Sequence, residues 1–73
     1  LLNTNQNIVG EIAGEEITLE EFALRVEEFK ASFQQRTGRI PSEPEMVSVR
    51  EQAWQAMIVE RVFDEEYEKL GLQ

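Results

Sequence analysis

The fold is decided by two stretches of sequence, residues 18–33 (TLEEFALRVEEFKASF) and residues 42–70 (SEPEMVSVREQAWQAMIVERVFDEEYEKL). Both open with a capping box, in which a Ser or Thr hydroxyl accepts an unpaired helix N–H and a glutamate three residues later reaches back. The two boxes pair Thr18 with Glu21 and Ser42 with Glu45. Because neither stretch contains glycine or proline beyond its first turn, each predicts one long helix.

The first helix is predicted over residues 19–36. Its large apolar residues alternate three and four positions apart, which places them on one helical face. Gly38 then supplies a C-terminal stop, and a short connector leads to the next helix. The residues of this face are Leu19, Phe22, Val26, Phe29 and Phe33.

The second helix is predicted over residues 43–70, with Pro44 in the first turn, where a missing N–H costs little. Its apolar face is broad in the middle. The main seam is Met46, Val49, Ala53, Ala56, Phe63, Tyr67 and Leu70, and the residues that widen it are Val47, Trp54, Met57, Ile58 and Val62.

A short β-hairpin is predicted before the first helix. Apolar and polar residues alternate loosely over residues 8–13, Gly14 allows a tight reversal, and residues 16–17 return. The sequence therefore predicts a mainly α fold, in which a short N-terminal β-hairpin is followed by two long helices of unequal length in a helical hairpin.

The unequal helix lengths predict uncovered apolar surface. At 1.5 Å per residue, the first helix is about 27 Å long and the second about 42 Å. About 15 Å of the second helix, around Phe63, Tyr67 and Leu70, is then left to the β-hairpin or to something outside this chain. We expect the fold to be completed by another chain segment or by a second copy.

Composition excludes several classes of function. The chain has 15 acidic and 7 basic residues, a net charge of −8, so nucleic acid is not an expected partner. It has no cysteine and no histidine, and it shows no Ca²⁺-loop spacing, phosphate-binding loop or nucleophile elbow. We therefore predict no catalytic residue, metal ligand or cofactor in these residues. A metal site on the glutamate clusters is a remote alternative, which calcium titration without a thermal shift would remove.

The N-terminus is expected to be a cut end. Residues 1–7 begin with Leu rather than Met and read as a polar linker from a removed upstream segment, while residues 8–73 form the domain. No apolar run approaches the ~20 residues of a membrane helix, and no signal-peptide pattern is present.

Two segments carry a family resemblance. Residues 9–22 (VGEIAGEEITLEEF) resemble the start of the N-terminal chaperone domain of the SurA and PpiD family, which has a strand, a Gly turn, a second short strand and a Thr-capped helix. Residues 50–60 (REQAWQAMIVE) and 66–72 (EYEKLGL) are similar to its second signature, a long helix ending in Lys-Leu-Gly. Ala13 departs from the Asn that the family often has there, and the connector at residues 39–41 suggests the PpiD-like branch.

The resemblance implies a periplasmic folding factor that holds unfolded envelope or outer-membrane proteins through this domain. It also implies that the parent chain carries a separate parvulin-type peptidyl-prolyl isomerase domain, so this fragment would not be an enzyme. PpiD-like members are anchored in the bacterial inner membrane by one upstream helix, which would be the only membrane contact. In the family a helix from the far end of the chain completes the domain, and without it a homodimer is expected.

We therefore predict an apolar groove between the two helices that binds extended, aromatic-rich client segments. The expected client or partner contacts are Phe22, Val26, Phe29, Phe33, Trp54, Met57, Ile58, Phe63 and Tyr67. Ordinary core packing is the competing interpretation for each aromatic residue, and Trp54 with Met57 and Ile58 is the better binding candidate. The competing function is a structural oligomerisation module whose apolar face a partner copy permanently covers.

Overall fold

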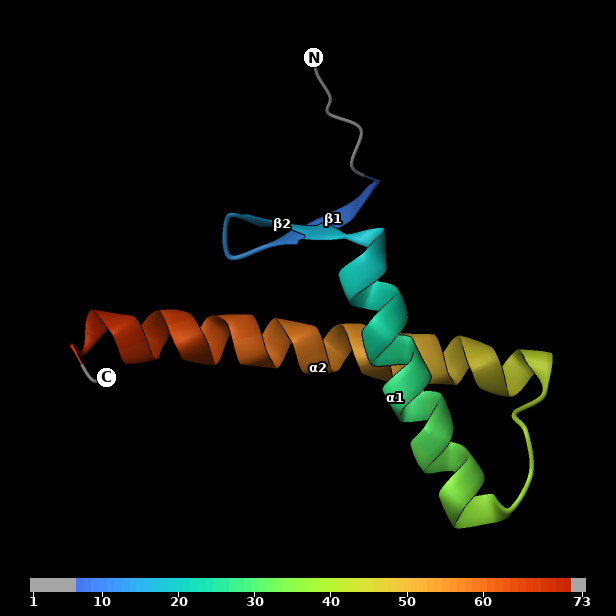
Figure 1. Ribbon diagram of the computed structural model, residues 1–73. Helices are drawn as coiled ribbons and strands as arrows, with labels where there is room; N and C mark the ends of the chain where they lie inside the picture. The colour runs from blue at the N-terminus through green and yellow to red at the C-terminus, as the bar shows by residue number, and fades with distance from the viewer. Residues whose placement is uncertain (1–6, 72–73) are drawn as a thin grey trace.

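The computed structural model describes residues 7–71 of the chain. Figure 1 shows a two-stranded hairpin followed by two helices, which confirms the predicted mainly α fold. The elements are β1 (Ile8–Ile12), β2 (Glu15–Thr18), α1 (Leu19–Thr37) and α2 (Glu43–Lys69). Each helix ends within one residue of its predicted limit. Of the predicted linker, only Asn7 lies inside the described residues.

The β-hairpin is closed by a two-residue turn. Ile12 pairs with Glu15 in the antiparallel ladder, so Ala13 and Gly14 form the turn, with φ values of 53° and 83°. Positive φ at both central positions is the pattern of a type I′ turn, which matches the twist of the two strands. Among the described residues other than glycine, Ala13 alone has a positive φ.

Replacing Ala13 with asparagine is expected to stabilise the fold by about 1 kcal/mol. The left-handed conformation costs an ordinary L-residue about 1–2 kcal/mol, and asparagine visits it far more readily. Urea denaturation followed by far-UV circular dichroism measures the change. Ala23→Asn makes the same substitution on the exposed surface of α1 and should destabilise, because asparagine has the lower helix propensity. A lower midpoint for Ala13→Asn would contradict the turn geometry.

Both helices begin at the hydroxyl residues that the sequence indicates. The Thr18 side chain accepts a hydrogen bond from the Glu21 N–H at 3.1 Å, and α2 has the complete capping box of Ser42 and Glu45. Gly38 ends α1 in the left-handed conformation, with φ of 78°, and donates its N–H to the Gln34 carbonyl. These local bonds satisfy helix-end groups that would otherwise lack partners.

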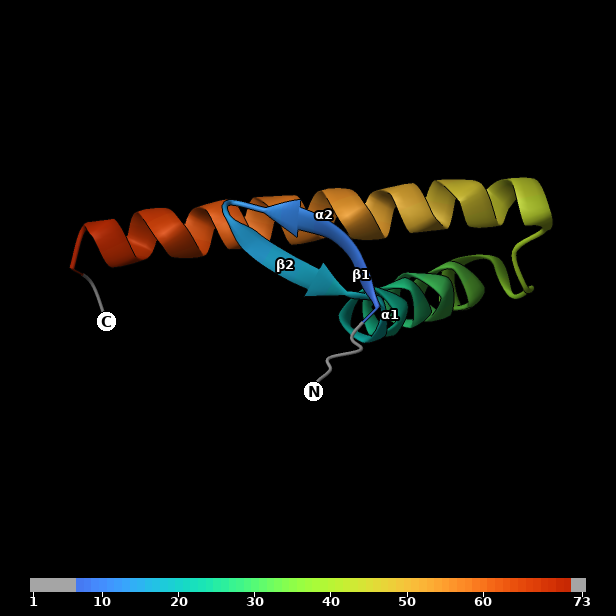
Figure 2. The same cartoon turned by 90° about the horizontal axis from the view of Figure 1, so that it is seen from above.

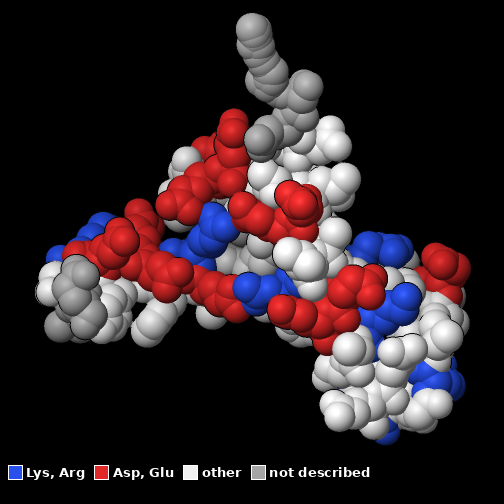
Figure 3. Space-filling view, viewed as in Figure 1, with Lys and Arg blue, Asp and Glu red and all other residues white. Residues whose placement is uncertain are grey.

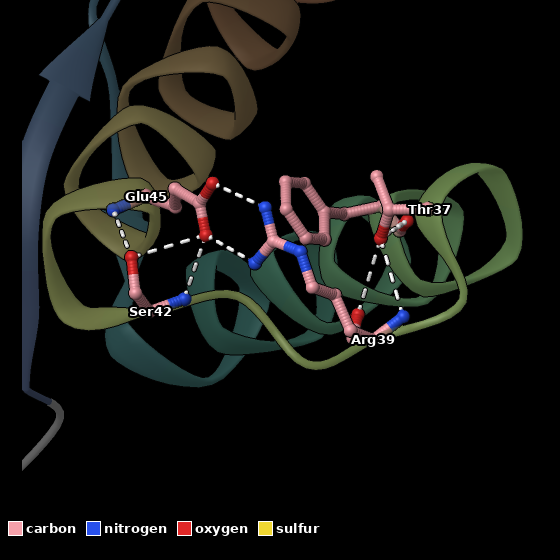
Figure 4. Close-up of polar contacts among 5 residues, drawn as sticks. Thr37, Arg39, Ser42 and Glu45 are labelled. Atoms are coloured by element: carbon pink, nitrogen blue, oxygen red, sulfur yellow. Dashed lines mark hydrogen bonds and ion pairs between the residues drawn. The ribbon is translucent and has the colours of Figure 1, made fainter.

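The connector between the helices is held by a compact polar network (Figure 4). Arg39 donates two hydrogen bonds of 2.8 Å to the Glu45 carboxylate, which also accepts the Ser42 backbone N–H at 2.9 Å. The Arg39 guanidinium lies 5.2 Å from the centre of the Phe33 ring, so α1 is tied to the start of α2. Pro41, within the connector, is buried.

Acidification is expected to weaken this connector. The hydrogen bonds from Arg39, and then the one from the Ser42 backbone, lower the pKa of Glu45 from 4.5 to about 2. A carboxyl whose pKa is lower in the folded state contributes stability that is present above its unfolded pKa and is lost as the pH falls through the folded pKa. The loss contributed by Glu45 should therefore develop between pH 4.5 and about 2.

Denaturation midpoints measured across this pH range test the expectation. Glu45→Gln should reduce the loss of stability on acidification, whereas Glu27→Gln, an exposed carboxylate on α1, should leave it as in the unmodified chain. Equal acid sensitivity in all three proteins would contradict the role of Glu45.

The two helices cross and do not lie side by side. In Figure 1 α1 passes in front of α2 near its middle, and Figure 2 shows from above that the hairpin lies on the same side of α2 as α1. At the crossing the buried residues are Val26, Val49 and Ala53, and Ala53 has no exposed surface. Such a small residue lets the two helix backbones approach closely.

A second cluster fixes the hairpin to α2. Ile12 and Ile17 of the hairpin pack with Met57 of α2, and Ile17 is fully buried. Phe22 packs against both clusters and joins them into one core. The core therefore covers the middle of α2, and the helix continues toward its C-terminus beyond the reach of α1.

Candidate functional site

The structure divides the nine expected contact residues into three groups by exposure. Val26 and Met57 are buried, and Phe63 and Tyr67 are exposed. The half-buried residues are Phe22, Phe29, Phe33, Trp54 and Ile58. Of the exposed pair, near the C-terminal end of α2, Phe63 is 64% and Tyr67 38% exposed.

The two helix faces expected to line a groove contact each other at Phe22 and Trp54, and client binding between them stays a prediction. Phe22 meets the Trp54 ring edge-on, with 5.7 Å between ring centres and 82° between planes. Val26 and Met57 lie in the two core clusters and are 8% and 4% exposed, and Met57 also lines a hollow of about 280 Å³ between α1 and α2. So short a chain has few apolar residues, and burying them internally is its main source of stability.

Trp54 illustrates this internal use of the expected site. The last atoms of its ring lie directly over Gly10 of β1, where an added Cβ would be 2.7 Å from Cη2. The Trp54 side chain is therefore part of the contact between the hairpin and α2. In the sequence, a glycine inside a strand indicates such a close approach by another group.

A row of exposed apolar residues runs along the C-terminal half of α2. We call it the C-terminal apolar surface and define it as Val59, Val62, Phe63, Tyr67 and Leu70. Phe63 is 64% and Leu70 71% exposed, which confirms the expectation that this part of the long helix lies uncovered. Val59 was not singled out in the sequence, although its spacing of four from Phe63 places both on one face.

The face of α2 that meets the hairpin is charged, in contrast to the C-terminal apolar surface. Met57, Arg61, Asp64 and Glu68 follow helical spacing, so the buried face becomes charged past the crossing. Arg61 donates to Glu15 of β2 at 2.7 Å and to Glu21 of α1 at 2.8 Å. One arginine thus joins all three elements.

A second arginine makes a similar link nearer the crossing. Arg25 of α1 forms a bidentate ion pair with Glu60 of α2 and also contacts Glu28. The hydrogen bonds from Arg25 lower the pKa of Glu60, and those bonds in turn raise the pKa of Arg25. Because Glu28 and Glu60 are exposed and Arg25 keeps 28% of its side-chain surface in solvent, the pairs orient the elements and add little stability.

A polar cleft of about 360 Å³ lies between the hairpin turn and the C-terminal half of α2. It is lined by Ala13, Glu15, Arg61, Asp64, Glu65 and Glu68. Figure 3 shows acidic side chains gathered over this part of α2 and over the hairpin. Within residues 7–71, no group of three or more acidic side chains is arranged to hold a metal ion.

Neither helix in the described part of the chain is long and apolar enough to cross a membrane. The fold and its exposed face define a small α-rich domain in which a β-hairpin and a crossing helix cover only part of a longer helix.

The chain belongs to the SurA-like N-terminal domain family, whose family model matches residues 1–73. Searches of curated proteins and of solved structures found no match. Membership of this family is consistent with a chaperone module.

Proposed function

We propose that this domain binds unfolded or extended segments of envelope proteins on the C-terminal apolar surface, as the chaperone module of a folding factor. The single observation that carries the proposal is the exposed row of large apolar side chains on α2 in a member of the SurA-like N-terminal family. Exposed apolar surface of this kind is typical of protein-binding sites, because burying it against a partner releases water.

The surface fits a weak and sequence-tolerant interaction. Its aliphatic and aromatic side chains sit on one helical face, and Phe63 and Tyr67 lie with ring centres 6.1 Å apart. A client segment could place successive apolar side chains against this row without needing defined hydrogen bonds. Polar specificity would then come from the charged groups beside it.

The wider setting is part of the same proposal. The family resemblance supports a PpiD-like parent on the periplasmic face of a bacterial inner membrane, with a separate parvulin-type isomerase domain outside these residues. The remainder of that parent, or a second copy in a homodimer, would be the other partners of the domain. We propose no enzymatic activity for the domain itself.

The test is a titration of the 73-residue chain, followed by amide NMR, with an unfolded aromatic-rich segment of an outer-membrane protein. Shifts are expected to cluster on residues 59–70. Phe63→Ser should weaken binding about tenfold or more, which corresponds to losing one well-packed apolar contact. Val47→Ser is the matched control, because Val47 is 61% exposed on the same helix but outside the surface.

The competing function, a structural oligomerisation module, rests on the same uncovered face. It predicts a dimer or larger assembly by light scattering, and no peptide-induced shifts up to millimolar concentration. Monomeric chain that binds the segment through residues 59–70 would support the chaperone proposal and exclude the alternative. Binding that Phe63→Ser leaves unchanged would overturn the proposed location.

A further inference from the structure

Charge is distributed unevenly along the molecule. Four of the seven basic residues lie near the connector, where α1 ends and α2 begins: Lys30, Arg36, Arg39 and Arg50. Residues 59–71, in contrast, contain five acidic and two basic side chains. Figure 3 shows acidic side chains dense along the C-terminal arm of α2 and the hairpin, whereas basic and acidic side chains are mixed toward the connector.

The basic side chains within this acidic region do not offset it. Arg61 is engaged by Glu15 and Glu21, which bring two further carboxylates to the region. Lys69 lies 3.7 Å from Glu66 and is well exposed. Asp64, Glu65 and Glu68 form no ion pair within the described residues.

From this arrangement we infer that the C-terminal apolar surface selects client segments whose apolar residues are interspersed with lysine or arginine. The inference rests on the proposed function and adds the class of client. A basic segment lying on Val59, Phe63 and Leu70 would meet Glu66 on the same face. The acidic side chains that line the hairpin side of α2 lie across a helix of about 10–12 Å diameter, which is comparable to the Debye length of about 10 Å at 0.1 M salt. Such complementarity raises association rates and discriminates among partners.

The same charges disfavour a second copy as the occupant. A symmetric dimer formed through this surface would place two identical acidic arms against each other. Glu66 and the other acidic side chains of the arm would then repel their counterparts, because five acidic residues outnumber the two basic ones in residues 59–71. Charge complementarity therefore favours a basic segment over a partner copy.

Three labelled peptides with identical apolar positions test the inference, with lysine, glutamine or glutamate at the intervening positions. Fluorescence anisotropy in about 20 mM salt should give the tightest binding for the lysine peptide, by about tenfold over the glutamine peptide. The glutamate peptide should bind most weakly. In about 500 mM salt the lysine advantage should fall to about twofold or less, because exposed charges are screened.

Variants locate the charge effect. Glu65→Gln with Glu66→Gln should reduce the lysine advantage by about half or more at low salt and leave the glutamine peptide unaffected. The matched control, Glu27→Gln with Glu51→Gln, changes net charge equally outside the C-terminal half of α2 and should leave the advantage in place.

The outcomes distinguish a failure of the inference from a failure of the proposed function. Equal affinity for the lysine and glutamine peptides would overturn the inference while leaving the proposed function intact. Failure of all three peptides to bind would overturn the proposed function instead. A lysine peptide whose amide shifts lie outside residues 59–70, or a chain that dimerises through this surface and excludes every peptide, would overturn the proposed function and, with it, the inference.

Discussion

Replacing Ile17 with alanine is expected to lower the free energy of unfolding by about 2–5 kcal/mol, the largest effect of any substitution considered. Ile17 is fully buried between the hairpin and α2, in contact with the cluster of Ile12 and Met57. Removing its side chain leaves a cavity where two elements meet. Because a domain of this size is marginally stable, the variant should be substantially unfolded at room temperature.

Urea denaturation followed by far-UV circular dichroism measures this loss, with sucrose added if the variant does not fold in buffer. Ile40→Ala is the matched control, because Ile40 is 66% exposed in the connector and should change stability by about 0.5 kcal/mol or less. Equal stability of the two variants would contradict the docking of the hairpin on α2.

Gly10→Ala is expected to destabilise the fold by about 1–3 kcal/mol through overpacking. The new Cβ would lie 2.7 Å from Cη2 of Trp54, closer than nonbonded carbon atoms approach, and 3.0 Å from Cζ2, which is a tight contact. The Trp54 ring also packs edge-on against Phe22, so a rotation away from the new methyl group would disrupt that contact. Thermal unfolding and the Trp54 emission spectrum should both change.

A double mutant separates this clash from other effects of alanine in a strand. Trp54→Phe removes the part of the ring that lies over Gly10, so the added methyl group should cost much less in that background. The losses in the free energy of unfolding of the two single mutants should therefore add up to more than the loss of the double mutant, by about 1 kcal/mol or more. Strict additivity would show that Trp54 does not pack on Gly10 in solution.

Both predictions concern the element that confines the candidate site. The hairpin covers the middle of α2 through Ile17 and Trp54, and the residues beyond it stay in solvent. If the hairpin detached, its buried residues would form a second exposed apolar surface. The stability of each destabilised variant should therefore be measured before its binding is interpreted, because a detached hairpin would add a second binding surface.

Local signals were sufficient to predict the elements. The capping residues Thr18 and Ser42 begin both helices as expected, and Gly38 ends the first. These features are readable because each depends on hydrogen bonds within a few residues of the chain. The turn at Ala13 was predicted from Gly14, although its alanine adopts the positive φ that asparagine would favour.

The candidate site was predicted only in part. Helix lengths correctly indicated that Phe63 and Leu70 would lie beyond the first helix. Client binding in the groove expected between the helices stays a prediction, and Phe22 and Trp54 contact each other there across α1 and α2. Apolar periodicity identifies which residues seek burial and cannot distinguish an internal partner from an external one.

The sequence by itself determined the helices, the hairpin, the acidic charge and an apolar row longer than one partner helix could cover. Only the tertiary structure decided where that row stays exposed, because the crossing at Ala53 limits how far α1 follows α2. It also decided that Arg61 would join the hairpin to both helices. Helix capping and periodicity act within a few residues, whereas a crossing depends on how side chains distant in sequence fit together.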